Sequence, residues 1–402
     1  MKSVLSEKET NNKEKINIIV TGCIHGSMDK MYKDIQEYSS TNKLKIDLVL
    51  CTGDFESIRE EKDLNFLACP EKYREMGDFH KYYTSKAKVP YLTIFIGGNH
   101  EASNYLEQNY YGGWVAPNIY YLGRSGVINV KGIRIAGVSG IFNKYDYFRG
   151  NFEKNEDDIK SDKKTIFHLR EFEIAKISHL KNHVDIFMTH DWPTNLIKEE
   201  DKEKIYKLYP HNKEGIIEGT IGSFPGEFIL RYLKPNYFIC GHMHFYYSNI
   251  IDDTQVYAFD KCVGKRQYFG FIQVKKSIEE IDINDDDIYI EPEWMAITHA
   301  FNEYQPKEYD YYSFYNLFNN NAKTIYNEFV LSKIKFNYFF KYKMEQTDIE
   351  TNIDDLLKNI FTERKKVNKE FDGQTKFLLS IFDIDIDDNN HFLSKLYLNQ
   401  NE

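Results

Sequence analysis

Five short segments of the chain end in polar side chains of the types that bind divalent metal ions. The segments end in the letters GCIHG, GDF, GGNHE, THDW and GHMH. Their donor side chains are those of Cys23, His25, Asp54, Asn99, His100, His190, His242 and His244. Imidazoles, a carboxylate, an amide oxygen and a thiol together suit a metal that accepts hard and borderline ligands. A lone histidine after a strand is more often structural, so the prediction of a metal site depends on the whole set.

Each of these segments contains an apolar run that predicts a buried β-strand. The runs are short, rich in Ile, Val, Leu and Phe, and lack strict alternation. They lie within residues 16–23, 46–55, 91–100, 184–192 and 236–244. Helix-compatible segments at 29–40 and 171–182 separate some of the runs, which predicts a layered α/β fold. Because polar loops at the carboxyl ends of such strands collect together, we expect the donor side chains to converge.

The composition indicates a globular protein with two unequal parts. The 402 residues are 42% hydrophobic and carry a formal net charge of -10. That charge argues against non-specific coating of nucleic acid, although it does not exclude a local basic groove. Residues 1–14 are polar and predict a flexible tail. We expect a catalytic domain over 15–275 and a smaller, mainly helical domain over 276–402, where an acidic stretch and aromatic segments follow.

The chain lacks the sequence features of a secreted or membrane protein. The N-terminus has no apolar core of the length that a signal peptide needs, and no later run is long and uncharged enough to span a bilayer. The five cysteines form no paired framework and no CxxC spacing. We therefore expect an intracellular protein with reduced thiols and no membrane contact.

The order of the donor segments resembles the metallophosphoesterase signature. That resemblance implies a β-sandwich flanked by helices that holds two metal ions. Cys23 stands where most of these enzymes have Asp, and a cysteine there resembles the RNA lariat debranching enzymes. Further stretches similar to that family are KYREMGDF, FIGGNHEASN, YGGWVAPNIYYLG, GVSGIF, THDWP and EPEWMAI. The resemblance extends into residues 276–402, which would form the C-terminal debranching domain.

The resemblance also implies a role for each donor side chain. One metal ion would be held by Cys23, His25, Asp54 and His244, and the other by Asp54, Asn99, His190 and His242. Asp54 would bridge both ions, and His100 would donate a proton to the leaving group. Glu101 and Asp191 would orient neighbouring histidines. A thiolate ligand favours Fe²⁺ and Zn²⁺, with Mn²⁺ also expected to support activity.

The expected substrate is branched RNA. The resemblance implies hydrolysis of the 2′–5′ phosphodiester bond at the branch point of excised intron lariats, with residues 143–165 as the lariat recognition loop. A long loop is otherwise more often variable surface. The candidate RNA contacts are Tyr73, Arg74, His80, Lys144, Tyr145, Arg149, His168 and Arg170. Their basic and aromatic side chains can neutralise phosphates and stack on bases.

Two other functions remain open at this stage. One is a broader phosphodiesterase or phosphoprotein phosphatase with the same metal core, and the other is a non-catalytic RNA-binding or splicing scaffold that has kept the fold. For the debranching function we expect a monomer in the nucleus, with the cytoplasm as a second location and splicing-related proteins as partners.

Overall fold

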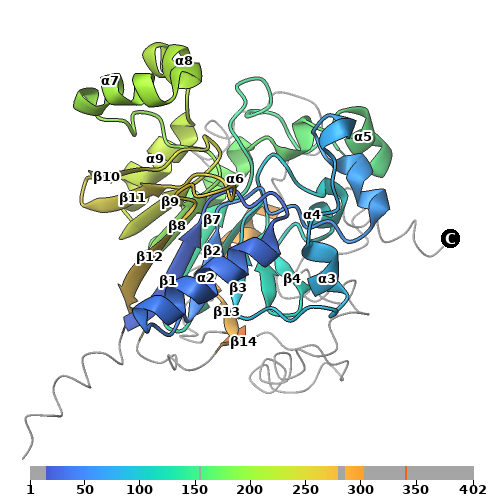
Figure 1. Cartoon of the computed structure of the whole chain (residues 1–402). Coiled ribbons are helices and arrows are strands. Elements are labelled where there is room, and N and C mark those ends of the chain that lie inside the picture. Colours follow the sequence, from blue (N-terminus) through green and yellow to red (C-terminus); the bar gives the residue numbers. More distant parts are fainter. Residues whose placement is uncertain (1–14, 154, 279–285, 303–339, 342–402) are drawn as a thin grey trace, which may run out of the picture.

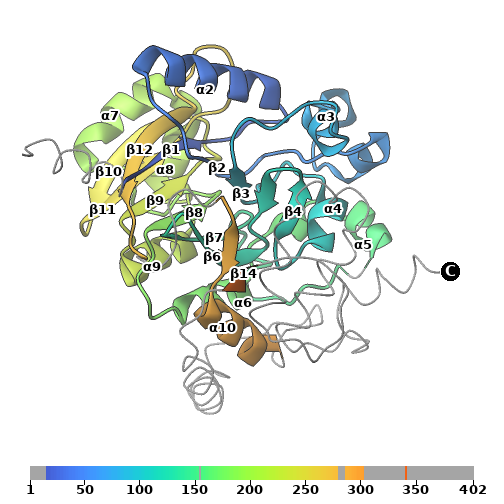
Figure 2. The ribbon, with the colours of Figure 1, turned by 90° about the horizontal axis from the view of Figure 1, so that it is seen from below.

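Two β-sheets stacked face to face form the centre of the structure (Figure 1). The computed structural model describes residues 15–153, 155–278, 286–302 and 340–341. Helices cover both outer faces of the sandwich (Figure 2).

The first sheet has six strands in the order β12-β1-β2-β3-β5-β4. Their bounds are β1 (Lys15–Thr21), β2 (Leu48–Cys51), β3 (Thr93–Phe95), β4 (Gly113–Ala116), β5 (Ile119–Tyr121) and β12 (Phe269–Lys275). Strands β1, β2, β3 and β5 run parallel to one another. The carboxyl ends of β1, β2 and β3 therefore lie at one edge of this sheet, and a donor segment follows each of them.

The second sheet has eight strands in the order β10-β11-β9-β8-β7-β6-β13-β14. Their bounds are β6 (Ser125–Val130), β7 (Ile133–Val138), β8 (Ile186–Thr189), β9 (Tyr237–Cys240), β10 (Tyr247–Ile251), β11 (Thr254–Ala258), β13 (Ile288–Ile290) and β14 (Phe340–Lys341). Strands β7, β8, β9 and β11 are parallel, so the donor segments after β8 and β9 also share an edge.

The five strands that precede the donor segments, β1, β2, β3, β8 and β9, are buried on both faces over most of their length, which explains their continuous apolar sequences. Ile18 and Val20 of β1 belong to the core between the sheets, together with Ile186 and Ile239 of the second sheet. The intervening Ile19 belongs instead to the core beneath α2. Alternate side chains of one strand thus enter two different apolar layers, as the two-residue repeat of a strand requires.

Helices enclose these layers on opposite sides of the sandwich (Figure 2). Helix α2 covers the first sheet, and α6, α9 and α10 pack on the second. The α-helices are α2 (Met28–Asn42), α3 (Phe79–Tyr83), α4 (Ser103–Gln108), α5 (Glu156–Ser161), α6 (Glu171–Ser178), α7 (Glu199–Leu208), α8 (Lys213–Glu218), α9 (Phe224–Leu233) and α10 (Pro292–Asn302). Short 3-10 helices are η1 (Glu61–Phe66), η2 (Glu71–Tyr73), η3 (Thr165–Phe167) and η4 (Pro210–Asn212).

All five predicted strands are present, as β1, β2, β3, β8 and β9, and the two predicted helices are α2 and α6. The apolar runs alone indicated one layered sheet, whereas the structure divides them between two. A strand buried on both faces is apolar throughout, whether it belongs to a single layered sheet or to a sandwich of two sheets. Only the resemblance to metallophosphoesterases therefore implied the sandwich. The α/β fold with a helix-flanked sandwich is confirmed.

The chain after residue 275 contributes to the second sheet as well. Strand β13 pairs antiparallel with β6. Beside it, the buried Arg134 places Nε 3.2 Å from Oε1 of Glu291 and Nη2 2.7 Å from Oε2 of Glu293. These ion pairs join the EPEW segment to the sandwich. Apart from β13, α10 and β14, the C-terminal domain lies outside the described residues, and its boundary at 275 stays a prediction.

Among the residues that the structure describes, no helix has both the length and the apolar character that a membrane crossing requires.

Candidate metal centre

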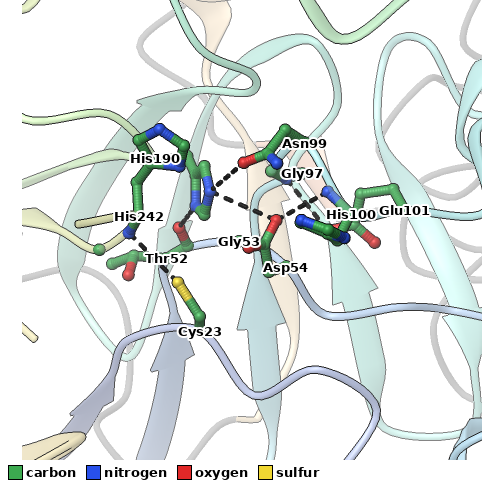
Figure 3. A network of polar contacts seen from close by, with 12 residues as sticks. Cys23, Thr52, Gly53, Asp54, Gly97, Asn99, His100, Glu101, His190 and His242 are labelled. Atoms are coloured by element: carbon green, nitrogen blue, oxygen red, sulfur yellow. Dashed lines mark hydrogen bonds and ion pairs between the residues drawn. The ribbon is translucent and has the colours of Figure 1, made fainter. Parts of the chain in front are cut away.

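The carboxylate of Asp54 lies at the centre of the donor side chains (Figure 3). It follows β2 and is 1% exposed. Its Oδ2 is 3.6 Å from Nε2 of His25, and its Oδ1 is 3.3 Å from Nε2 of His190. The two oxygens therefore face histidines from different sheets. Such an arrangement suits a carboxylate that bridges two cations.

One group of donors surrounds Oδ2. The donor atoms of Cys23, His25, Asp54 and His244 all lie within 4.8 Å of one another. Nε2 of His25 and Nε2 of His244 are 3.2 Å apart. Oδ2 of Asp54 is buried and has no hydrogen-bond partner among the described residues. Two facing imidazole nitrogens, a buried thiol and an unpartnered carboxylate oxygen fit a divalent cation.

The second group of donors surrounds Oδ1. Nε2 of His190 lies 3.2 Å from Oδ1 of Asn99, and the rings of His190 and His242 have centroids 5.0 Å apart. On its other side, Nδ1 of His190 is 2.7 Å from the carbonyl oxygen of Thr52. That contact leaves Nε2 free to act as a ligand. The structure thus brings together both predicted donor sets, while their role as ligands stays a prediction.

Several donors occupy strained backbone conformations. The φ angles are +44° at His25, +48° at Asp54, +63° at His242 and +55° at His244. Non-glycine residues rarely adopt this left-handed region, and each costs on the order of 1 kcal/mol or more. Such strain concentrates at functional sites, where the surrounding structure holds it in place.

Two glycines give the donors the space they occupy. A Cβ atom at Gly53, where φ is +103°, would lie 2.4 Å from Nδ1 of His190. A Cβ atom at Gly98 would lie 2.2 Å from Oδ1 of Asp54. Any side chain at either position would displace a donor group, which explains the glycine in GDF and in GGNHE.

The electrostatics of the site match the needs of metal binding. Burial raises the pKa of Asp54, but the positive potential of His190 and His25 outweighs it and holds that pKa well below its usual range. Burial and the nearby charges of His25 and Lys261 lower the pKa of His244 to about 3. Asp54 is therefore an anion and His244 a neutral imidazole at physiological pH. Burial, with the charge of Asp54 second, raises the pKa of the Cys23 thiol well above normal. A thiolate at Cys23 thus requires a cation beside it.

The contacts of Glu101 and Asp191 differ from the prediction that they orient histidines. Glu101 accepts hydrogen bonds from the backbone N–H groups of Phe55, Glu56 and Gly98 at 2.9, 2.9 and 3.0 Å. It therefore joins the loops after β2 and β3. Asp191 accepts from the backbone N–H groups of Phe142 and Trp192. Their geometric role is to hold backbone, because their side chains point at amides rather than imidazoles.

Glu56 is a functional candidate that the sequence reasoning missed. Its Oε1 lies 3.0 Å from Nδ1 of His25, on the side of the ring opposite His244. A carboxylate behind a metal-binding histidine sets the ring's orientation and tautomer. Its position could have indicated this role, because Glu56 is an acidic residue two positions after the ligand candidate Asp54.

His100 lies at the mouth of the site and is half-buried. Its backbone N–H donates to Oδ1 of Asp54 at 2.8 Å, and its ring centroid is 5.2 Å from that of His25. Within the described part of the chain, its imidazole has no hydrogen-bond partner. The ring is therefore accessible to a substrate, as the predicted proton donor requires.

The predicted recognition loop presents two of its candidate RNA contacts to solvent. Tyr145 is 61% exposed, and Lys144 is also exposed, with its Nζ 5.0 Å from the centroid of the Tyr145 ring. Arg149 is less accessible and pairs with Asp146 at 2.9 Å. Lys144 and Tyr145 are thus available to a nucleic acid, and their role as contacts stays a prediction.

His168 and Arg170 are placed differently from the prediction. Arg170 is 1% exposed, and its guanidinium donates to Glu153 at 2.9 Å and to the carbonyl of Asp146 at 3.0 Å. His168 is buried, with Nδ1 2.5 Å from Oδ2 of Asp146. Both side chains hold the predicted recognition loop from inside and are not exposed to a substrate. The acidic residues of the loop are their partners, which sequence alone could not reveal.

Replacing Arg170 should therefore destabilise the protein. Arg170→Met leaves the buried carboxylate of Glu153 without its ion pair, which should cost roughly 3–5 kcal/mol of unfolding free energy. Arg231→Met is the matched control, because its pair with Glu227 is exposed and should contribute about 1 kcal/mol or less. Urea unfolding measures both. A stable Arg170→Met variant that binds RNA weakly would restore the direct-contact interpretation.

The remaining candidate RNA contacts lie in the segment around η2 and α3. Tyr73 is 63% exposed. Arg74 donates from Nε to the carbonyl of Cys69 at 3.1 Å, and burial followed by the charge of Arg74 lowers the pKa of Lys163. Arg74 also lies 3.9 Å from the carboxylate of Glu71, so part of this positive charge is compensated within the segment. His80 is half-buried in α3, and its Nδ1 has no hydrogen-bond partner among the described residues.

Comparison with known proteins identifies the family. Residues 16–246 match the family of calcineurin-like phosphoesterases, and residues 252–384 match the C-terminal domain of lariat debranching enzyme. The lariat debranching enzyme of Arabidopsis thaliana is 40% identical over 300 residues, which cover 72% of this chain and 70% of that protein. The chain belongs to the lariat debranching enzyme family. Family members from Gallus gallus and Homo sapiens are 39% and 38% identical over 71% of this chain. The match spans 55% and 54% of those two proteins, or about half their length.

Family membership makes this chain a hydrolase of the metallophosphoesterase type with a divalent metal site. All donor side chains around Asp54 lie within the matched phosphoesterase region, residues 16–246. They do not come from one continuous stretch of sequence. The donors come from five segments spread over more than two hundred residues. The fold thus gathers the predicted donor side chains within the region that matches the phosphoesterase family.

Proposed function

We propose that this protein hydrolyses the 2′–5′ phosphodiester bond at the branch point of excised intron lariat RNA and so gives linear RNA for turnover or processing. The observation that carries the proposal is the position of the Asp54 carboxylate between two donor groups, in a member of the lariat debranching enzyme family. A generic metal core alone would fit many phosphoesters, so the family supplies the substrate.

The donor residues fit two divalent ions, and Fe²⁺ and Zn²⁺ are the proposed occupants. Cys23, His25, Asp54 and His244 would hold one ion, and Asp54, Asn99, His190 and His242 the other. A thiolate donor is softer than a carboxylate and shifts preference toward Fe²⁺ and Zn²⁺, while Mn²⁺ should also support activity. When bound, such ions act as Lewis acids that neutralise phosphate charge and lower the pKa of water.

The protein's own residues complete the reaction. Water adds to phosphorus and releases one proton to solvent, while the bond from phosphorus to the 2′-oxygen breaks. The imidazolium of His100 gives its proton to that departing oxygen, so the products are a free 2′-hydroxyl and a 5′-phosphate. Glu56 fixes the ring of His25, and Glu101 holds the loops after β2 and β3 in register. Lys144 and Tyr145 would bind the RNA around the branch.

The cellular setting belongs to the same proposal. Lariats arise by splicing, so we place the protein in the nucleus, with the cytoplasm as a second location and splicing-related proteins as partners. It should act as a monomer, because one chain supplies every residue of both donor groups.

Cys23 allows a direct test of the metal assignment. Cys23→Asp keeps an anionic donor but a harder one, so the metal that gives highest activity should change from Fe²⁺ or Zn²⁺ toward Mn²⁺. Cys23→Ser should lose about tenfold or more in metal affinity, because a neutral hydroxyl supplies neither charge nor softness. Cys51→Ser is the control, since Cys51 is also buried but donates to backbone carbonyls. Metal content and cleavage of branched RNA are measured for all three. Wild-type behaviour of Cys23→Ser would make Cys23 a packing residue.

The substrate is tested with a synthetic RNA that carries one 2′–5′ branch. The purified protein should cleave the branch and leave the linear 3′–5′ bonds intact. Comparable cleavage of linear RNA would favour the broader phosphodiesterase. Binding of branched RNA without cleavage, in a protein that retains no metal, would favour the scaffold.

A further inference from the structure

The loop between β11 and β12 carries a positive surface beside the metal centre, on segments that the predicted recognition loop does not include. Residues 260–266 read DKCVGKR and include Lys261, Lys265 and Arg266. Lys265 and Arg266 are exposed, and Lys261 is half-buried. This short loop thus carries three cations against one carboxylate, that of Asp260, in a chain with a formal net charge of -10.

This loop is attached directly to the donor segments. The backbone N–H of Cys262 donates to the carbonyl of Cys23 at 2.8 Å. The guanidinium of Arg266 donates to the carbonyl of His244 at 3.4 Å and to Asp260 at 3.0 Å. The positive side chains therefore keep a defined position relative to the site.

The loop also forms one wall of an open groove against α2. The groove has a volume of about 550 Å³, which is within the range of small-molecule binding pockets. Lys265 and Arg266 line the loop side, and Tyr38 lies on the α2 side with its ring 5.8 Å from that of Phe269. Arg266 thus belongs both to the groove and to the rim of the metal centre.

The charges of this groove are unequally compensated. On the α2 side, Lys30 forms an ion pair with Asp34, and Glu37, which also lines the groove, lies 3.9 Å from Lys33. On the loop side, Asp260 is buried and pairs with Arg266, while Lys261 and Lys265 have no carboxylate partner among the described residues. A polyanion would therefore gain most by contacting the loop side.

We propose that this loop and groove bind the phosphates of one single-stranded arm of the branched RNA as that arm leaves the metal centre. The proposal rests on the debranching function proposed above. A branch point has three emerging strands, and the predicted recognition loop is a separate segment. Unpaired strands bind where cations meet the backbone and an aromatic ring is available to a base. The groove offers both at the edge of the site.

The proposal is tested by removing the two unpaired charges in a protein that binds but does not cleave. Lys261→Gln and Lys265→Gln are combined in a His100→Ala background, and fluorescence anisotropy measures binding of branched RNA with long arms. We expect affinity to fall about tenfold at low salt and the slope of log K against log salt to fall by about 1.4, or roughly 0.7 for each lost phosphate contact. Lys261→Arg with Lys265→Arg should retain wild-type affinity.

Two controls separate the possible outcomes. Lys45→Gln removes an equally charged side chain, 79% exposed, that precedes β2 and so lies at the other end of the sheet. It should change neither the affinity nor the salt slope. With the natural His100, the single variant Lys265→Gln, which leaves the charge of Lys261 beside His244 in place, should cleave branched RNA with single-nucleotide arms at the wild-type rate.

Unchanged affinity of the double Gln variant for long-armed RNA would overturn the proposal, as would an equal loss of affinity for short-armed RNA. Failure of the wild-type protein to prefer branched over linear RNA would instead contradict the debranching function itself. The two failures are thus distinguishable in one set of measurements.

Discussion

Asp54→Ala should abolish cleavage of branched RNA, with kcat reduced by roughly 10⁴-fold or more. Asp54 is the only carboxylate shared by the two described donor groups, and its oxygens lie 3.6 Å from His25 and 3.3 Å from His190. Removing it leaves two cations in one cavity without their common anion. We therefore expect the purified variant to lose metal as well as activity, which elemental analysis measures.

Asp185→Asn is the matched control for Asp54→Ala. Asp185 is also a buried carboxylate, 2% exposed, but it precedes β8 and accepts from the backbone N–H of Arg134 at 2.8 Å. It lies at the end of the strand away from the metal centre. The control should lower the free energy of unfolding by about 1–3 kcal/mol without changing metal content. Near-normal turnover of Asp54→Ala at full metal occupancy would contradict the bridging arrangement.

His100→Ala should slow the chemical step by about 10²–10⁴-fold while metal content and affinity for branched RNA stay close to wild type. The imidazole is accessible at the mouth of the site, and only its backbone N–H contacts Asp54. Its proposed task is to protonate the departing 2′-oxygen. An aryl phosphodiester has a leaving group that needs no proton, so the variant should cleave it at nearly the wild-type rate.

The alternative role for His100 is metal binding. Donor atoms of His25, Glu56 and His100 lie within 4.8 Å of one another, so a cation at that position is geometrically conceivable. Loss of metal from His100→Ala, or an equal loss of rate on both substrates, would assign His100 to the ligands. His80→Ala serves as a control histidine, because it lies in α3 outside both donor groups.

The strands and the donor residues were predictable from sequence for one physical reason. A strand buried on both faces must be apolar throughout, and the polar residues that follow it mark where it ends. This pattern identified β1, β2, β3, β8 and β9 together with the segments that follow them. The division of those strands between two sheets was not predictable from the residues. A strand that is buried on both faces is apolar throughout, whichever sheet it belongs to.

The errors concern charged residues whose partners cannot be identified from residue types. Arg170 was expected at the RNA surface, but it is buried against Glu153. The sequence does not show whether an arginine side chain contacts a phosphate of the substrate or a carboxylate inside the protein. Glu101 was expected to orient a histidine, but it accepts hydrogen bonds from backbone amides on two loops, and residue types do not reveal backbone partners.

The sequence by itself determined the family and the α/β character, and it predicted the set of metal-binding side chains. These properties depend on residue types and on spacing within short segments, which the sequence contains in full. Only the tertiary structure decided that Asp54 lies between two histidine groups, that Glu56 fixes His25, and that Arg266 joins the metal centre to the groove beside α2. Each of these features depends on distances between segments that are far apart in the sequence. Those distances are set when the two sheets pack against each other through their apolar layers.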